Sequence, residues 1–375
     1  LAQILLPDHR LTDQHKKWIE NSLKSIVLAL LTNCPPDQRH AYLEDLIQWY
    51  RRDDITERNK EALLQAAIMV DPSYCSDAQK ADLLTFADRI MAGSNSGLKV
   101  AAASVRSHFG DERAKEAYIP ELKECLGYDP ASDLTRDELS EMYLDNLKAG
   151  TPWPVKVANI RLMLKTLEGA GKEEQVLHVA THLGNLVKVS ETVVVRRRAG
   201  EALVSIIDKM PLSQRNEIAV ELGKGLEIGD YQFSKYIPDY LGVIMLHLPP
   251  RELDELIADL EKFLGATNGQ VAAAVLHTFG IVIENYNIYE GLFGHSETSE
   301  ARMARKYKLV SLIIRGFANY NDIISQEALW TIGMNIFGSE HLSLDEKYDI
   351  FCHCGKRILT LYENRREGEL DFFNN

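Results

Sequence analysis

The chain has 375 residues, of which 45% are hydrophobic, and its formal net charge is −13. This composition suffices for one large core or several smaller ones, whereas the acidic balance disfavours non-specific binding to DNA or anionic membranes. The longest purely apolar run, Ile26 to Leu31, is far too short to span a bilayer. The five cysteines are odd in number and mostly far apart, which predicts free thiols in a reducing compartment and hence a cytoplasmic protein.

The first 97 residues are rich in helix formers and predict an N-terminal helical subdomain, residues 1–97. Thr56 and Ser76 are credible helix N-caps, and Gln79 completes a capping box with Ser76. The sequence GSNSG at 93–97 predicts a flexible loop, which ends this subdomain.

Residues 98–150 predict a second set of helices. An Ala-rich stretch begins at Leu98, a tight turn follows at Gly110, and spaced leucines continue to Leu126. The two prolines of GTPWP, at 150–154, exclude a continuing helix. We therefore place a subdomain boundary after residue 150.

A regular repeat occupies residues 151–283. Pro249 follows Pro211 at an offset of 38, and apolar residues recur at the same offset around them. The recurring positions of the first helix are Leu203, Leu241 and Phe279, followed by Ile206, Ile244 and Val282; those of the second helix are Ile218, Leu222 and Leu226, followed by Leu256, Leu260 and Leu264. A backward step of 39 adds Leu164, Leu167, Val179, Leu183 and Val187. Four units therefore share one apolar template.

Each unit predicts two amphipathic helices that cannot bury their apolar stripes alone, so neighbouring pairs must stack. The stretch LKVAAASVRSHFGDERAKEAYIPELKECL (98–126) and the helix start VRRRAGEAL (195–203) resemble HEAT-type helical repeats. The resemblance covers about 98–362. It implies an all-α fold, a right-handed α-solenoid of stacked antiparallel helix pairs of the armadillo/HEAT superhelix type.

An irregular segment, residues 284–308, interrupts the repeats and predicts an insertion loop at one edge of the solenoid. It contains four aromatic or imidazole side chains next to two arginines: Tyr286, Tyr289, Phe293, His295, Arg302 and Arg305. Exposed aromatics beside arginines are typical of protein or peptide interfaces. The alternative is that the tyrosines and Phe293 fold back onto the neighbouring helices.

Residues 309–375 predict a C-terminal repeat and cap, and contain the sequence FCHCGKR (351–357). Its two cysteines and histidine look like a metal cluster. The repeat template, however, places Cys354 on the buried ladder with Ile350 and Ile358, where a thiol behaves as a small hydrophobe. Cys352 lies roughly 200° away around the helix, and His353 and Lys356 are expected to face outward. We therefore predict a packing helix and no metal site.

Two other groups of residues suggest ligand binding. Arg196, Arg197 and Arg198 spread over roughly 200° of a helix, so pairing with Glu191 or Glu201 is favoured over a phosphate site. His178 and His182 are spaced i, i+4 like metal ligands, but no third ligand is evident nearby. Phosphate-loop, GxSxG, HExxH and paired CxxC motifs do not occur in the sequence.

These observations favour a non-catalytic helical-repeat scaffold that binds a protein or peptide partner and forms a module of a larger multidomain protein. No cofactor and no catalytic residue is predicted. The alternative is a helical-repeat domain that binds nucleic acid or serves an attached enzyme domain. Nucleic-acid binding requires a continuous stripe of basic side chains on the concave surface of the repeats.

Overall fold

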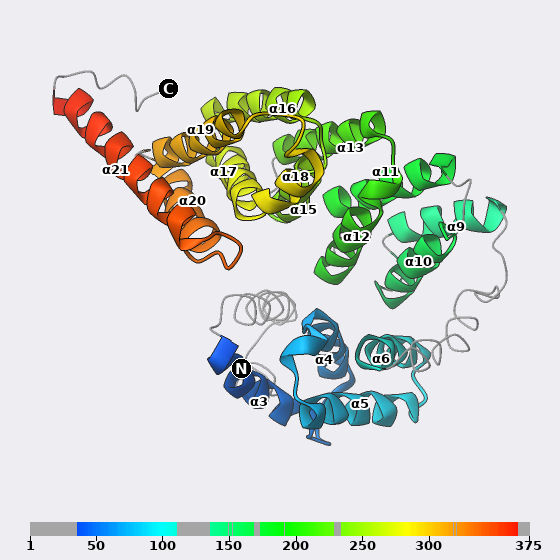
Figure 1. The fold of residues 1–375 in the computed structure, drawn as a ribbon. Helices are drawn as coiled ribbons and strands as arrows, with labels where there is room; N and C mark the ends of the chain where they lie inside the picture. The colour runs from blue at the N-terminus through cyan, green and yellow to red at the C-terminus, as the bar shows by residue number, and fades with distance from the viewer. Residues whose placement is uncertain are drawn as a thin grey trace. The chain divides into compact units, whose positions relative to one another are not determined.

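The computed structural model describes residues 36–110, 136–148, 150–151, 153–168, 173–190, 192–228, 234–317, 319 and 321–366. These residues form sixteen α-helices with short 3-10 turns and one π-helical turn, and no strand occurs among them. The prediction of an all-α fold is confirmed (Figure 1). The chain divides into two compact units, Leu1–Thr166 and Leu167–Asn375.

The first unit contains α3 (Pro36–Tyr50), α4 (Glu57–Met69), α5 (Asp77–Met91), α6 (Ser96–Phe109), α9 (Arg136–Leu147) and α10 (Trp153–Lys165). The predicted caps form: Thr56 caps α4, and Ser76 and Gln79 make a reciprocal capping box at the start of α5. The predicted loop at 93–97 is shorter than expected, because Asn95 caps α6 and the helix begins at Ser96.

In this unit α6 packs against α4, α5 and α10, and α10 also packs against α9. Tyr50 lies at the centre of the first three helices: it is fully buried, it donates a 2.7 Å hydrogen bond to the Leu63 carbonyl, and its ring meets Phe86 edge-on. The division between the units falls after α10, whereas the boundary predicted from the two prolines lies after residue 150. The predicted second helix of the Leu98 repeat, residues 111–126, lies outside the described residues.

The second unit contains α11 (Glu173–Val189), α12 (Val193–Ile206), α13 (Leu212–Gly225), α15 (Ile237–Met245), α16 (Pro250–Lys262), α17 (Gly269–Glu284), α18 (Tyr286–Phe293), α19 (Ser299–Phe317), α20 (Asp322–Thr331), the π-helical turn η5 (Ile332–Phe337) and α21 (Leu344–Arg366). Pro211 and Pro249 directly precede α13 and α16. This placement suits proline, because the first turn of a helix has no partner for its backbone N–H groups.

The helices of the second unit form two rows. One row contains α12, α15, α17 and α20, each packed against the next, and the other contains α11, α13 and α16, continued by α19 (Figure 1). Most of the aligned apolar positions are buried: the side chains of Leu203, Leu241 and Phe279 are 0% exposed. Leu264 is an exception, since it lies half-buried in the 3-10 turn that ends α16.

Glycines allow the helices of the first row to approach closely. A Cβ atom on Gly242 would lie 2.6 Å from the Ile281 side chain, and one on Gly280 would lie 2.3 Å from Cγ2 of Thr331. These two glycines occupy equivalent positions of neighbouring repeats, since they are separated by the same offset as Pro211 and Pro249. The repeat therefore includes a contact that only a residue without a side chain permits.

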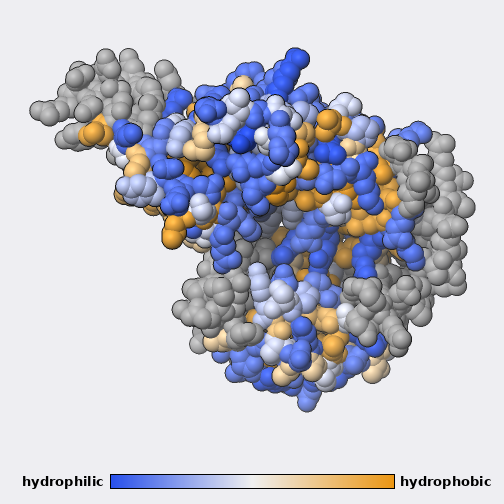
Figure 2. Space-filling model, in the orientation of Figure 1, coloured by the Kyte–Doolittle hydropathy of each residue, from blue (hydrophilic) through white to orange (hydrophobic). Residues whose placement is uncertain are grey.

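The face in view in Figure 2 is mainly hydrophilic, with hydrophobic side chains gathered in several patches. Within the described residues, no single helix is both long and apolar enough to cross a membrane. Together α17 and α18 pass the test of length and composition, but they are bent by 57° at their junction.

Candidate functional site

The segment predicted as an insertion loop, residues 284–308, is helical in most of its length, so the prediction of a loop is wrong. It consists of α18, a short connection and the first turns of α19. Asn285 ends α17, and Thr298 begins α19 by accepting a 3.2 Å hydrogen bond from the Ala301 backbone. The run SEARMARKYK contains strong helix formers, which explains why α19 begins well before the Leu309 start expected from apolar periodicity.

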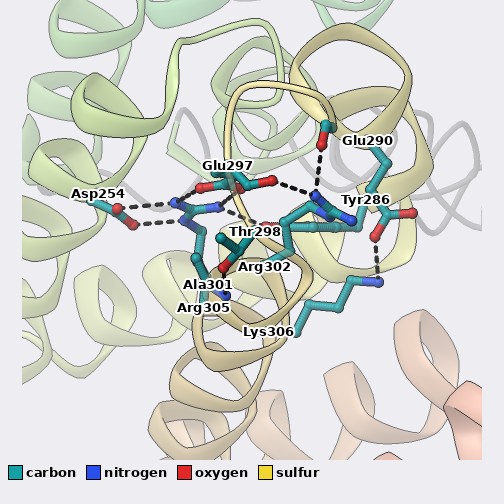
Figure 3. A network of polar contacts seen from close by, with 10 residues as sticks. Asp254, Tyr286, Glu290, Glu297, Thr298, Ala301, Arg302, Arg305 and Lys306 are labelled. Carbon is teal, nitrogen blue, oxygen red and sulfur yellow. Dashed lines mark hydrogen bonds and ion pairs between the residues drawn. The ribbon is translucent and has the colours of Figure 1, made fainter.

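The buried side chain of Arg305, on α19, is the centre of a polar network that joins this segment to neighbouring helices (Figure 3). Its guanidinium binds both carboxylate oxygens of Asp254 on α16, at 2.6 and 3.0 Å, and both oxygens of Glu297, at 2.7 and 2.9 Å. It also donates a 2.9 Å hydrogen bond to the hydroxyl of Tyr286. The Arg305 side chain is only 5% exposed, so these partners replace the water that it loses.

Aromatic rings line the network on the side of α18. The Arg305 guanidinium lies 5.1 Å from the centre of the Tyr289 ring, and the Lys306 ammonium lies 4.6 Å from that of Tyr286. The two tyrosine rings contact each other, and Tyr289 also contacts Phe293. These cation–π contacts add stabilisation where the cations are desolvated.

Lys306 and Arg302 extend the network to further elements. The Lys306 ammonium lies 3.0 Å from Glu290 of α18 and 3.2 Å from Glu346 of α21. The Arg302 guanidinium donates to the backbone carbonyls of Gly294 and Glu297, at 2.7 and 3.0 Å. The first turns of α19 thus hold α16, α18, the connection and α21 together.

The environment of the network keeps Tyr286 and Glu297 each in one protonation state near neutral pH. Burial raises the pKa of Tyr286 to about 12, so its hydroxyl stays neutral and accepts from Arg305. The hydrogen bonds from Arg305 hold the pKa of Glu297 below its ordinary value, so this carboxylate stays ionised. A group held in one protonation state near neutral pH is a poor acid or base catalyst. The arrangement is suited to bracing a structure.

The structure places the six predicted interface residues in different environments. Tyr286, Tyr289 and Arg305 are buried, so the expectation that they are exposed is wrong, and the alternative that the tyrosines fold back is the one observed. Phe293 and Arg302 are half-buried, and only His295 of the six is exposed. The physical reason is that Asp254 and Glu297 compensate the charge of the buried Arg305. Tyr286 and Tyr289 are buried against its guanidinium.

Besides the predicted His295, the segment carries exposed residues that were not predicted from the sequence, and the Arg305 network supports them. We call residues 291–300 the tip. Leu292 is 45% exposed, and the side chains of His295, Ser296 and Glu300 are also exposed. The tip is anchored at both ends, because Tyr289 precedes it on a buried turn and Arg302 binds the Gly294 carbonyl from beyond it. A single exposed leucine beside buried tyrosines carries no signal in the sequence itself.

A second polar group, also missed, runs along the first row of helices. His277 of α17 lies between Asp239 of α15, at 3.1 Å, and Glu327 of α20, at 2.8 Å. Burial alone lowers the pKa of His277, but the two carboxylates outweigh this effect and raise it to about 10. The signal was present in the repeat, since Glu201, Asp239 and His277 occupy the same position of three successive units.

The arginine run at 196–198 serves the protein's own helices. Arg196 is 1% exposed and donates to the carbonyls of Ser190, Val187 and Lys188, which are the unsatisfied acceptors at the C-terminal end of α11. Arg197 and Arg198 both pair with Glu201, as predicted. Glu191, the other predicted partner, lies outside the described residues.

The two histidines at 178 and 182 are in different environments. His178 is exposed and lies 3.9 Å from Glu174, whereas His182 is buried, which lowers its pKa to about 4. Within the described ranges, no group of three or more histidine, cysteine, aspartate or glutamate side chains is arranged to hold a metal ion.

In FCHCGKR, Cys354 is buried as predicted, together with Ile350 just before it, while Cys352 is half-buried and Lys356 is exposed. The side chain of Ile358 lies outside the described residues. The expectation that His353 faces outward is wrong: its ring stacks on Tyr307 and lies 2.8 Å from the Ser311 hydroxyl. These contacts are possible because α19 lies directly against α21.

A scan against protein-family models and a search of curated proteins found no match to this sequence. The function is therefore inferred from the packing and the surface of the chain itself.

Proposed function

We propose that this chain is a non-catalytic helical-repeat scaffold that binds a protein or peptide partner. In this proposal the second unit is a right-handed α-solenoid of the HEAT type, built from stacked antiparallel helix pairs. Two features support it: the two rows of helices, and the glycine contacts that recur with the period of the repeat.

The observation that carries the binding proposal is the exposed tip on a buried base. Leu292 presents an apolar side chain to solvent, and His295 lies exposed shortly after it. Beneath them Arg305, Glu297 and Tyr286 fix the position of α18. A preorganised contact loses less conformational entropy on binding than a mobile loop, and binding residues are often carried on loops held by a rigid scaffold.

The charges around the tip indicate the chemistry of the partner. Glu290 on α18 is paired with Lys306, whereas Glu300 on α19 is exposed and the whole chain has a net charge of −13. Acidic surroundings with an apolar centre complement a partner that offers an apolar side chain flanked by basic ones. We therefore propose a basic, amphipathic protein segment as the ligand of the tip.

A further observation supports a scaffold in preference to the nucleic-acid alternative. Several basic side chains of α12 and α19 are paired with acids, as in Arg197 with Glu201 and Lys308 with Glu261. Such paired charges differ from the unpaired basic surface that releases counterions from nucleic acid. The free thiols of Cys75, Cys352 and Cys354 support a reducing, cytoplasmic location.

The proposal is tested by point variants of the tip. Deleting the whole tip is unsuitable, because it removes Glu297 and leaves Arg305 without one of its two carboxylates. Leu292→Asp changes only an exposed side chain, and Leu212→Asp on α13 is a matched control, because both leucines are 45% exposed.

A photo-crosslinking residue is placed at position 292 or 212, and the proteins cross-linked in cells are identified and then purified for direct binding measurements. We expect a partner that cross-links from 292 alone, and whose affinity falls at least about tenfold in Leu292→Asp and not in Leu212→Asp. Equal cross-linking from both positions, or unchanged affinity in Leu292→Asp, would refute the tip as the binding element.

A further inference from the structure

One face of α21 is fully used within the second unit. Ile350 and Cys354 are buried, Glu346 binds Lys306, and His353 stacks on Tyr307. All these contacts join α21 to α19 and its surroundings. The inner face of this helix therefore has its partner.

The opposite face of α21 carries a row of large exposed apolar side chains. The exposed fractions are 83% for Leu344, 67% for Tyr348, 62% for Phe351 and 57% for Leu359. At about 100° per residue these positions, together with the exposed Gly355, lie within roughly 80° of one another. We call these five residues the outer stripe. Figure 2 shows hydrophobic side chains at the surface where α21 lies in Figure 1.

The size of the outer stripe sets it apart from scattered surface leucines. From the exposed fractions, its four large side chains present roughly 500 Å² of apolar surface. This is at the upper end of what monomeric proteins expose and is often functional. In a repeat array an apolar helix face is normally buried against a neighbouring element, so the outer stripe is expected to be covered.

A second copy of α21 in antiparallel orientation matches the stripe. When the two-fold axis passes beside Phe351 and Cys352, Leu344 lies opposite Leu359 of the partner subunit. Tyr348 then lies opposite Gly355 of the partner subunit, where the missing side chain leaves room for the ring. Phe351 meets the partner's Phe351 at the axis. The large side chains of one stripe thus meet either an apolar side chain of the other stripe or the space beside its glycine.

The charges beside the stripe select the antiparallel orientation. Asp345, Asp349 and Lys356 lie on one flank of the helix, within roughly 40° of one another, and all three are exposed. In antiparallel pairing this flank lies against the same flank of the partner helix, which runs in the opposite direction, so Asp349 approaches the partner's Lys356. In parallel pairing this flank would face the partner's other flank, so Asp349 and the partner's Lys356 would lie on opposite sides of the interface and could not pair. The helix dipoles also oppose each other in the antiparallel pair.

We propose that the outer stripe of α21 is the contact of a homodimer, in which two copies of this helix pair in antiparallel orientation about an axis beside Cys352. The apolar area is smaller than the roughly 800 Å² per partner of a standard interface. The rim residues on both flanks supply the remainder, and the dimer is expected to dissociate at low protein concentration. The proposal is independent of the partner bound at the tip.

The first experiment measures the mass of the full chain by sedimentation across protein concentrations. We expect a monomer–dimer equilibrium, weakened at least about tenfold by Phe351→Asp. The control is Leu329→Asp on α20, since Leu329 is 58% exposed and lies outside the stripe. A monomer at every concentration, whether because another segment of this chain or a different protein covers the stripe, would overturn the proposal. So would a dimer weakened equally by both variants.

The second experiment tests the orientation by charge reversal and cross-linking. Asp349→Lys alone is expected to weaken the dimer several-fold, and Asp349→Lys with Lys356→Asp is expected to restore it. A short bis-maleimide is expected to join two copies through Cys352, and the cross-link is expected to disappear in Cys352→Ser. Failure of the double variant to recover, or the absence of a cross-link through Cys352, would exclude the antiparallel register.

Discussion

Arg305 on α19 binds both carboxylate oxygens of Asp254 on α16, although the two residues are far apart in the sequence. This pair fastens the segment between α17 and α19 to the preceding repeat. A second carboxylate, Glu297, holds the other side of the guanidinium. The segment that interrupts the repeats is therefore an integral part of the fold, and the tip at its end has a rigid support.

Replacement of Arg305 is expected to destabilise the second unit strongly. Arg305→Ala leaves Glu297, whose side chain is 10% exposed, as a buried charge without its main partner. Removing one partner of a buried ion pair lowers the free energy of unfolding by about 3 kcal/mol. Chemical denaturation measures the change. Asp254→Asn should have a smaller effect, because the Asp254 side chain is 58% exposed. Arg251→Ala, at an exposed pair on the same helix, should change nothing measurable.

The contribution of Glu297 to stability is expected to depend on pH in the acid range. Its pKa is lowered in the folded protein, chiefly by the hydrogen bonds from Arg305. A carboxylate with a depressed folded pKa stabilises the protein above its unfolded pKa of about 4.3 and loses this contribution as the pH falls through the folded value. The unfolding free energies of wild type and Glu297→Gln should therefore converge below about pH 4. A difference that stays constant down to pH 3 would contradict this account.

His277 is expected to act in the opposite direction, at alkaline pH. Its folded pKa is about 10, above the unfolded value of about 6.5. The stabilisation is therefore complete below pH 6.5 and declines as the pH rises to 10. Nuclear magnetic resonance should find the His277 ring still protonated at pH 8, and the stability advantage over His277→Gln should shrink between pH 7 and 10. A ring that titrates near 6.5 would show that Asp239 and Glu327 do not hold it.

Gly280→Ala is expected to destabilise the row formed by α17 and α20. The new Cβ would lie 2.3 Å from Cγ2 of Thr331, so the two helices must separate. Overpacking of this kind lowers the free energy of unfolding by about 1–3 kcal/mol. Gly184→Ala on α11 is the matched control, because nothing lies within 4 Å of its Cβ position. That variant should be neutral or stabilising by up to about 1 kcal/mol, since alanine is the better helix former. Equal effects of the two substitutions in denaturation would refute the close approach.

The helix pairs of the second unit were predictable from the sequence because their signal is local. Ile218 and Leu222 lie one turn apart, and Leu256 and Leu260 reproduce this spacing in the next unit. A helix that must bury one face displays this spacing whatever it packs against. The same template correctly placed Cys354 in the interior, where composition alone suggested a metal ligand.

The environment of the interrupting segment was not predictable in the same way. Tyr286 and Arg305 have the composition of an exposed interface, and no local pattern separates that use from burial. The outcome depends on Asp254, which lies on another helix and resembles any surface acid in the sequence. The exposed face of α21 was missed for a related reason, because Leu344 and Phe351 appear as ordinary apolar residues until the inner face of the helix is known.

The sequence alone thus determined that this chain is helical and where its helix pairs recur, because backbone hydrogen bonding and one-sided burial impose a short-range period on the residues. Only the tertiary structure decided which polar residues meet. Whether Arg305 lies in solvent or in the core depends on the free energy cost of its desolvation and on the stabilisation that it gains from the carboxylates of Asp254 and Glu297. Asp254 is distant in the sequence, and only the folded chain brings it to Arg305.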